Sequence, residues 1–237
     1  MKIALIGYGK MGKAIEEIAG LQGHTVVLKI DHHNSHDLTA KNLLCADVAI
    51  EFTGAESALA NIKLCFDAGL PVVSGSTGWL DHFDHAKQYC NDKHGTFLYA
   101  SNFSIGVNIF FEINRRLANL MAKRDEYGVA IKEIHHTQKK DIPSGTAISL
   151  AEQIIEEIPA RSTWSVTNGD AKTIKIIAER IDPAPGTHHV KYESDIDDIE
   201  IIHTAHSRKG FASGALAAAE FIIDKKGIYT MKDVLGL

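Results

Sequence analysis

Residues 2–12 read Lys-Ile-Ala-Leu-Ile-Gly-Tyr-Gly-Lys-Met-Gly, and this stretch decides the fold of the N-terminal part of the chain. Its first five residues form a short apolar run. Gly7, Gly9 and Gly12 follow, and an apolar pattern of helical period continues to residue 18. A glycine fingerprint between a strand and a helix is typical of the turn that binds a dinucleotide pyrophosphate. We therefore predict a Rossmann strand–turn–helix unit, against the alternative of a glycine-rich turn that binds nothing.

Each glycine has a steric role in this interpretation. Gly7 allows the tight turn, Gly9 lets a pyrophosphate approach the backbone, and Gly12 lets helix and strand pack closely. A second apolar run, residues 25–30, ends in Asp31. An acid at this place typically accepts hydrogen bonds from an adenosine ribose, which strengthens the dinucleotide prediction.

Asp31 also bears on which nucleotide is used. Its carboxylate should repel a 2′-phosphate, and no arginine follows it; only His32 and His33 are near. We therefore expect NADH to be preferred, although the two imidazoles could tolerate NADPH.

The chain continues with the alternation of a parallel sheet. Strand-like runs at 47–52, 71–74 and 96–100 alternate with helical stretches at 56–68 and 80–94. Small polar residues follow each of these runs, at the carboxyl ends of strands, where open α/β sheets bind their ligands. The last of these turns precedes a long helix to about residue 122, and we expect a domain boundary there.

After that helix the pattern predicts a mixed or antiparallel sheet, and hence a second domain of the α+β class. The strand-like runs lie at 129–136, 173–180, 187–193 and 198–205, with one helix at 146–158. Residues 159–173 are polar and lack periodicity, so we expect a loop. Residues 209–225 are helical and apolar on most faces, which predicts a helix buried between layers.

Residues 133–147 hold the strongest functional signal in the second domain: Glu-Ile-His-His-Thr-Gln-Lys-Lys-Asp-Ile-Pro-Ser-Gly-Thr-Ala. His135 and His136 titrate near neutral pH, and Lys139 and Lys140 supply positive charge. Proton-transfer groups and cations within so short a stretch indicate a reaction site.

The same stretch ends in a predicted helix start. Pro143 suits the first turn of a helix, and apolar residues of helical period follow it. The backbone N–H groups of Ser144, Gly145 and Thr146 should then face outward, unpaired, where an anion fits. Gly145 lacks a side chain that would hold the anion off, and the two hydroxyls add donors. Taken alone, the stretch fits equally well two histidines in a strand and a plain helix cap.

Composition indicates a soluble enzyme of one large or two modest domains. The chain has 237 residues, 45% of them hydrophobic, and a formal net charge of −5, so nucleic acid is not an expected partner. The widely spaced Cys45, Cys65 and Cys90 fit neither a disulfide framework nor a zinc site. With no leader-like N-terminus and no apolar run of membrane length, we expect no membrane partner and a cytoplasmic location.

The remaining histidines do not predict a metal site. They occur at His32, His33, His36, His82, His85, His188 and His189. None has carboxylates or thiolates at ligand spacing, so we expect no bound metal. Arg208 precedes the last apolar helix and could pair with a carboxylate between domains or with an acidic neighbour; a structural or hinge role is favoured.

Taken together, the motifs resemble those of the bacterial dihydrodipicolinate reductase family, also called 4-hydroxy-tetrahydrodipicolinate reductase, over almost the whole chain. The motifs that carry the resemblance are Gly7-Tyr-Gly-Lys-Met-Gly12, Gly75-Ser-Thr-Gly78, Ala100-Ser-Asn-Phe-Ser-Ile-Gly-Val107, His135 to Thr146, and His203 to Gly214. The resemblance implies NAD(P)H-dependent reduction of dihydrodipicolinate to tetrahydrodipicolinate in lysine and diaminopimelate biosynthesis.

The resemblance also implies a domain plan. Residues 1–102 and 207–237 would form the Rossmann domain, completed by the C-terminal helix. Residues 103–206 would form the mixed-sheet domain, which binds substrate and builds a homotetramer.

Site residues follow by position from the same resemblance. The adenosine diphosphate portion of the cofactor would lie on Gly7, Tyr8, Gly9, Lys10, Met11, Gly12 and Asp31. The nicotinamide would lie on Gly75, Ser76, Thr77, Ala100, Ser101, Asn102 and Phe103. His135 matches the family's proton donor or acceptor, and Lys139 matches its second proton-donating or charge-stabilising group. Substrate-binding positions would be His136, Lys139, Gly145 and Thr146, to which the helix start adds Ser144.

The chemistry explains why such groups are needed. When a cyclic, unsaturated dicarboxylate accepts a hydride, negative charge builds on the ring-nitrogen side, and a lysine and a histidine can stabilise it and deliver a proton. Thr137 and Gln138 stand where the family commonly has arginine and histidine, so neither should be essential. Lys140 stands where the family usually has an apolar residue. Which of the two lysines stabilises the charge is therefore open, although spacing favours Lys139.

Two rival functions remain at this point. Another two-domain dehydrogenase would share the plan, but the paired histidines and the Pro-Ser-Gly-Thr helix start argue against it. A non-enzymatic nucleotide sensor would keep the glycine turn and would need no proton donor.

Overall fold

The computed structural model describes residues 1–207 and 209–237, so Arg208 and its expected role lie outside the described residues. The chain divides into two compact units. The first comprises Met1–Ile105 and Lys209–Leu237, and the second is the described part of Gly106–Arg208. The first unit is therefore built from both ends of the chain.

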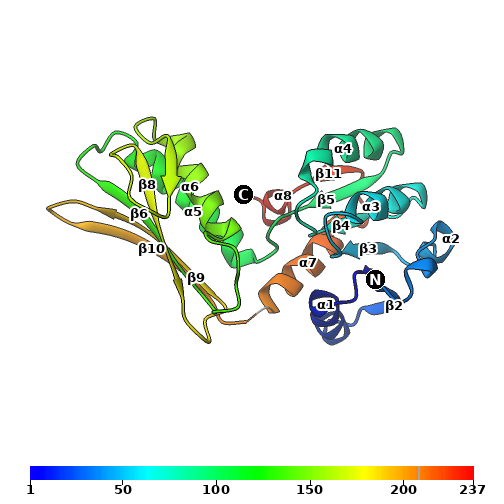
Figure 1. Cartoon of the computed structure of the whole chain (residues 1–237). Coiled ribbons are helices and arrows are strands. Elements are labelled where there is room, and N and C mark those ends of the chain that lie inside the picture. Colours follow the sequence, from blue (N-terminus) through cyan, green and yellow to red (C-terminus); the bar gives the residue numbers. More distant parts are fainter. Residues whose placement is uncertain (208) are drawn as a thin grey trace. The chain divides into compact units, whose positions relative to one another are not determined.

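The first unit contains a six-stranded parallel sheet of the Rossmann type (Figure 1). Its strands are β1 (Lys2–Ile6), β2 (Thr25–Ile30), β3 (Val48–Glu51), β4 (Val72–Ser74), β5 (Thr96–Tyr99) and β11 (Gly227–Tyr229). The order is β11-β5-β4-β3-β1-β2, so the direction of strand addition reverses at β1. Such a switch point is where open sheets of this class bind ligands, at the carboxyl ends of the strands.

Helices cover both faces of this sheet. They are α1 (Lys10–Leu21), α2 (Ala40–Leu43), α3 (Ala58–Asp67), α4 (Phe83–Asp92), α7 (Lys209–Ile222) and α8 (Met231–Leu235), with short 3₁₀ turns at Ser35–Asp37 and Leu80–His82. One core packs α1 and α7 on the sheet, and a second core packs α3 and α4 on the opposite face (Figure 1). Half of the residues of α7 are buried, which confirms that this apolar helix lies within the layers.

A close contact fixes α7 against the turn after β5. A Cβ atom at Gly214 would lie 1.7 Å from the carbonyl oxygen of Phe103, so only glycine allows this approach. The Phe103 side chain is itself buried, 2% exposed, in the same core.

The second unit has a five-stranded mixed sheet with the order β10-β9-β6-β8-β7. Its strands are β6 (Gly128–His135), β7 (Thr163–Ser165), β8 (Thr173–Arg180), β9 (Gly186–Glu193) and β10 (Asp198–Ala205). β6 is parallel to β8 and antiparallel to β9. The helices α5 (Ile105–Met121) and α6 (Gly145–Glu157) cover one face of the sheet (Figure 1). The predicted α/β class with a second, mixed sheet is thus confirmed.

Four short elements depart from the expectations. One is α2, which lies between β2 and β3 in the sequence, where no helix was predicted. β7 lies inside residues 159–173, which were expected to be a loop, and β11 and α8 follow the last predicted helix. β7 and β11 each have three residues, too few for the alternation that identifies a strand in a sequence. Among the described residues, every helix falls short of the length and apolar character that a membrane crossing requires.

Candidate active site

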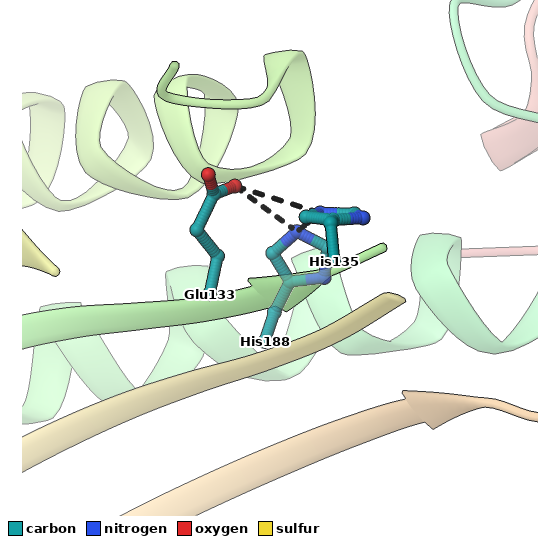
Figure 2. Close-up of side chains that lie close together, drawn as sticks. All are labelled: Glu133, His135 and His188. Carbon is teal, nitrogen blue, oxygen red and sulfur yellow. Dashed lines mark hydrogen bonds and ion pairs between the residues drawn. The ribbon is translucent and has the colours of Figure 1, made fainter. Parts of the chain in front are cut away.

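Two neighbouring strands of the second unit bring three buried titratable side chains together. Residues 131, 133 and 135 of β6 alternate onto the helix-covered face, because successive side chains of a strand point to opposite sides. His188 of β9 is paired with Glu133 in the antiparallel register. Glu133 is 0% exposed, His188 4% and His135 8%, and Figure 2 shows the three side chains pointing toward one another.

The distances within this group are short. Nε2 of His135 lies 3.3 Å from Nε2 of His188 and 3.6 Å from Oε2 of Glu133. Nε2 of His188 lies 3.8 Å from the same oxygen. His188 was considered in the sequence only as a neighbour of His189, and nothing in the sequence linked it to His135.

The same three residues form a group that could hold a metal ion, which the sequence did not predict. His188 showed no ligands at metal-binding spacing in the sequence, but the fold places donor atoms of Glu133, His135 and His188 within 4.8 Å of one another. A divalent cation can be held by such a set. However, Nδ1 of His188 is buried without a partner, whereas a metal-bound histidine almost always donates its other N–H. The arrangement therefore fits hydrogen bonding among protein groups better than a bound metal.

Glu133 is a buried carboxylate that the protein keeps ionised. Nη2 of Arg180 donates to its Oε1 at 3.0 Å, and the backbone N–H of Ser144 donates to its Oε2 at 3.0 Å. Burial alone would raise the pKa of Glu133, but interactions with His135, Ser144 and Arg180 lower it to about 2. Neither Glu133 nor Arg180 was singled out from the sequence, although both lie within or opposite the predicted reactive stretch.

His188 is kept uncharged in this environment. Burial lowers the pKa of His188 to about 3, and the neighbouring His135 acts in the same direction. On the next strand, His203 faces His188 in the register, and its pKa is also lowered, mainly by burial. The site thus contains two neutral imidazoles, those of His188 and His203, together with the ionised carboxylate of Glu133.

The helix start differs from the expectation at Ser144. Its N–H was expected to be unpaired, but it donates to Glu133, and its hydroxyl accepts from the N–H of Ala147 at 3.2 Å and lies 3.1 Å from Nε2 of His188. Ser144 is the N-cap of α6 and is 2% exposed. Pro143 lies before the cap rather than in the first turn.

Two residues of the helix start remain open. Gly145 is exposed and Thr146 half-buried. No described residue accepts a hydrogen bond from the backbone N–H of either one. A Cβ atom at Gly145 would meet nothing within 4 Å. These two N–H groups therefore keep the anion-binding capacity that the sequence predicts for the stretch.

The turn between β6 and α6 is braced by ion pairs and carbonyl contacts. Nζ of Lys139 lies 2.7 Å from Oδ2 of Asp141. Arg180 donates to the carbonyl oxygens of Lys139, at 3.3 Å, and of Asp141, at 2.6 Å. Lys140 is exposed and has no ion-pair partner among the described residues. His136 is half-buried. The two lysines thus differ in environment, which the sequence did not reveal.

The substituted position Thr137 has a structural partner. Its hydroxyl donates to Asp182 at 2.6 Å, and its N–H donates to the other oxygen of that carboxylate at 3.2 Å. These bonds tie the turn to the end of β8.

A large cavity of about 910 Å³ lies in the first unit at the carboxyl ends of β1, β2 and β3. Of the residues expected to bind the adenosine diphosphate portion, five line it: Gly7, Tyr8, Gly9, Lys10 and Asp31. Met11 and Gly12, and the residues expected at the nicotinamide, do not line this cavity.

The glycines have the steric surroundings expected of a dinucleotide turn. Gly7 has φ +99°, and a Cβ there would lie 2.1 Å from the carbonyl oxygen of Phe52. A Cβ at Gly12 would lie 2.7 Å from the carbonyl oxygen of Gly7, while a Cβ at Gly9 would meet nothing within 4 Å. The open space at Gly9 fits the close approach of a phosphate.

The rim of the cavity carries both signs of charge. Oδ1 of Asp31 accepts the backbone N–H of His33 at 2.7 Å, and this bond is the main reason that the pKa of Asp31 is lowered. Lys10 and Lys13 line the same cavity. Lys13 was not singled out from the sequence, although it follows the glycine fingerprint directly.

A second buried carboxylate, Glu51, organises the turns after β3 and β4. It is 0% exposed and accepts hydrogen bonds from the hydroxyls of Ser74, at 2.6 Å, and Ser76, at 2.7 Å. The N–H and hydroxyl of Thr53 also donate to it. Ser76, expected at the nicotinamide, therefore has its hydroxyl bound inside the protein, and sequence reasoning missed the acid that holds it.

In the turn after β5, side chains expected at the nicotinamide also contact other parts of the protein. Asn102 accepts the N–H of Ser104 at 2.9 Å, and Phe103 packs on Phe52 with ring centroids 5.6 Å apart. Ala100 and Asn102 are half-buried and Ser101 is exposed, while Gly75 and Thr77 lie in the turn after β4.

Comparisons with known proteins agree over nearly the whole chain. The family described as Dihydrodipicolinate reductase, N-terminus, matches residues 1–103, and Dihydrodipicolinate reductase, C-terminus, matches residues 106–235. A protein of Christiangramia forsetii named 4-hydroxy-tetrahydrodipicolinate reductase is 52% identical over 236 residues, which cover 99% of this chain and 98% of that protein. A protein of the same name from Methanosarcina barkeri is 37% identical, covering 97% of this chain and 82% of its own.

Solved structures share the fold. Dipicolinate-bound dihydrodipicolinate reductase from Paenisporosarcina sp. TG-14 has a TM-score of 0.77 at 21% identity and covers 97% of both chains. A probable dehydrogenase from Thermotoga maritima has a TM-score of 0.55 at 11% identity, with 99% of this chain and 92% of that chain covered.

Proposed function

The chain belongs to the dihydrodipicolinate reductase family, and we propose that it reduces 4-hydroxy-tetrahydrodipicolinate to tetrahydrodipicolinate in lysine and diaminopimelate biosynthesis. The family is NAD(P)H-dependent, so the chain is an oxidoreductase. The observation that carries the assignment of the site is that the stretch from His135 to Thr146 surrounds one buried cluster with an open helix start.

The substrate would be held by charge. A cyclic dicarboxylate offers two anionic groups, and the free N–H groups of Gly145 and Thr146 at the positive end of α6 suit one of them. Lys139 and His136 would contribute to the same binding site. The solved relative with bound dipicolinate, itself a cyclic dicarboxylate, supports this substrate class.

His135 and Lys139 would carry the chemistry. The reduced nicotinamide supplies a hydride when it is bound. The 4-hydroxyl group of the substrate leaves as water, and the unsaturated ring that remains would accept the hydride. Negative charge would then build on the ring-nitrogen side, where the ammonium of Lys139 would stabilise it and a proton from His135 would neutralise it. Lys139 is half-buried with one carboxylate partner, whereas Lys140 is exposed, which supports the division of roles in favour of Lys139.

The cofactor would bind the cavity of the first unit. Gly7, Gly9 and Asp31 supply the turn and the acid that a dinucleotide needs. We propose that NADH is preferred because Asp31 repels a 2′-phosphate. Lys10 and Lys13 on the same rim support use of NADPH as well.

We further propose that the second unit forms a homotetramer. The face of its sheet opposite the helices carries exposed Ile177 on β8, 40% exposed, and Ile202 on β10, 54% exposed. Large apolar side chains on an uncovered sheet face favour association. Light scattering at micromolar concentration tests the assembly: a mass near four chains supports it.

We also propose a cytoplasmic location. Cys45, Cys65 and Cys90 are all free thiols, as expected in a reducing compartment.

A coupled assay tests the reaction. The product of the synthase that condenses pyruvate with aspartate semialdehyde is supplied with NADH or NADPH, and loss of the reduced nicotinamide is followed. Rapid oxidation supports the proposal. Tight nucleotide binding with no turnover of any substrate would instead indicate a sensor, and faster reduction of other imines or keto acids would overturn the substrate assignment.

A further inference from the structure

We propose that Glu133 is a positioning residue that holds the proton of His135 on Nε2, so that His135 exchanges protons with the substrate through Nδ1, while His188 remains a neutral support. The proposal rests on the proposed function, in which His135 is the proton donor. It adds the residues that decide which ring nitrogen reacts.

The open ring nitrogen of His135 is Nδ1. Nε2 faces the buried group, at 3.3 Å from His188 and 3.6 Å from Glu133. Nδ1 of His135 has no hydrogen-bond partner among the described residues, but it is not among the fully buried atoms without a partner. Nδ1 of His188 and Nδ1 of His203 are buried without a partner. Gly186 keeps this side of the ring clear, because a Cβ there would lie 2.9 Å from Cε1 and 3.2 Å from Nδ1 of His135.

The tautomer of His188 follows from its sealed Nδ1. A buried N–H without an acceptor is costly and rare, so the proton of the neutral ring lies on Nε2. Ser144 offers the nearest acceptor, since its Oγ lies 3.1 Å from this nitrogen. With a proton on its own Nε2, His188 has no lone pair there to accept one from His135.

Proton exchange at Nδ1 then requires Glu133. An imidazole that gives and takes a proton at Nδ1 keeps its other proton on Nε2 in both states. That N–H needs an acceptor, and Oε2 of Glu133 is the remaining one, at 3.6 Å. Such catalytic contacts are often long without ligand and tighten when the substrate binds.

The surrounding groups keep Glu133 ionised and able to accept a hydrogen bond from His135. Five groups outside the cluster lie around it: Arg180 on β8, His203 on β10, Ser144 at the start of α6, and Lys139 and Asp141 in the turn. Arg180 and the N–H of Ser144 fix the two carboxylate oxygens, one each. The carboxylate therefore stays ionised and is available to accept the N–H at Nε2 of His135.

The first test reads the tautomer of the whole protein without mutation. Long-range ¹⁵N–¹H correlation spectra distinguish a proton on Nδ1 from one on Nε2, and they are recorded after treatment with a chelator. We expect neutral His135 and His188 both to carry the proton on Nε2. A neutral His135 protonated on Nδ1, or a zinc ion found stoichiometrically in the untreated protein, overturns the proposal.

The second test uses Glu133→Gln, which keeps the shape but removes the charge. We expect kcat to fall about tenfold to a hundredfold with a smaller change in KM. In the same ¹⁵N–¹H spectra, His135 of this variant should lose its preference for the proton on Nε2, because that N–H no longer has a charged acceptor. Glu133→Asp should restore part of the activity. Unchanged kcat and an unchanged tautomer of His135 in a folded Glu133→Gln protein contradict the proposal.

Matched controls separate this inference from the proposed function. Glu200→Gln breaks a Glu–His pair outside the cluster, in which Oε1 of Glu200 lies 2.8 Å from Nδ1 of His189, and it should leave kcat and the tautomer of His135 unchanged. If His135→Asn keeps full turnover, the proposed proton donor is wrong. If His135→Asn is inactive while Glu133→Gln matches the wild type, His135 remains the proton donor and the positioning role of Glu133 is wrong.

Discussion

Glu133 accepts the backbone N–H of Ser144 at 3.0 Å, which ties the central strand of the second sheet to the first residue of the helix cap. One N–H of the helix start is thereby used inside the protein. The next two N–H groups, of Gly145 and Thr146, are left for a ligand. A carboxylate of the protein and a carboxylate of the substrate would then share one helix terminus.

Gly145→Ala separates substrate binding from folding. A methyl group at this position meets no protein atom within 4 Å, so the fold accepts it, and a helical alanine is more favourable than glycine by about 1 kcal/mol. It would stand where the substrate carboxylate is proposed to bind, so we expect KM for the substrate to rise about tenfold, the effect of about 1.4 kcal/mol. Steady-state kinetics measure this. Gly20→Ala in α1, which is equally unobstructed, is the control and should leave KM unchanged.

Lys139→Ala should lower kcat by at least about a hundredfold, the usual scale for loss of an acid or a charge-stabilising group. The matched change is Lys140→Ala, which removes an exposed lysine one position away and should cost less than about threefold. Near-normal turnover of the first variant, or an equal loss in both, would contradict the assignment.

Asp31→Asn should move cofactor choice toward NADPH. The pKa of Asp31 is lowered, chiefly by the N–H of His33, so the side chain is charged at neutral pH and repels a 2′-phosphate. Without that charge, the rim keeps Lys10 and Lys13, and we expect the ratio of kcat/KM for NADPH over NADH to rise about tenfold. Asp37→Asn, on the same loop, serves as the control, and an unchanged ratio in Asp31→Asn would show that the carboxylate does not discriminate.

The stability of the protein should fall on acidification because of His188. Burial lowers the pKa of His188 from 6.5 to about 3, so between these values the unfolded chain binds a proton that the folded protein does not. The free energy of unfolding therefore decreases as the pH falls through this window, by up to about 1.4 kcal/mol per unit. Denaturant unfolding of His188→Gln should show a flatter dependence. His36→Gln, an exposed histidine, should retain the wild-type slope, and equal slopes in all three proteins would refute the linkage.

Much of the fold was predictable because its signals are local. The apolar run before Gly7, the period of the helices and the change of pattern after the long helix all lie within short windows. The three-residue strands β7 and β11 were missed because their existence depends on a partner strand and not on their own sequence.

The site was only partly predictable for a related reason. His135, Lys139 and Gly145 are visible in one stretch, but the partners of His135 are set by strand pairing across long separations. The register of β6 with β9 places His188 opposite Glu133, and the register with β8 places Arg180 opposite His135. Glu51 was missed because a single acid at the end of an apolar run looks like an exposed strand terminus.

The contact between Phe103 and Gly214 has a further consequence for how the chain is assembled. Ser104 and Gly210 lie beside it, with the serine hydroxyl 3.7 Å from where a Cβ of Gly210 would stand. The polypeptide therefore departs from the first unit and re-enters it at adjacent points, as an inserted domain does. Residues 1–105 joined to 209–237 through a few glycines would keep all six parallel strands and α7. Such a miniature protein should fold and bind nucleotide without the remainder of the enzyme.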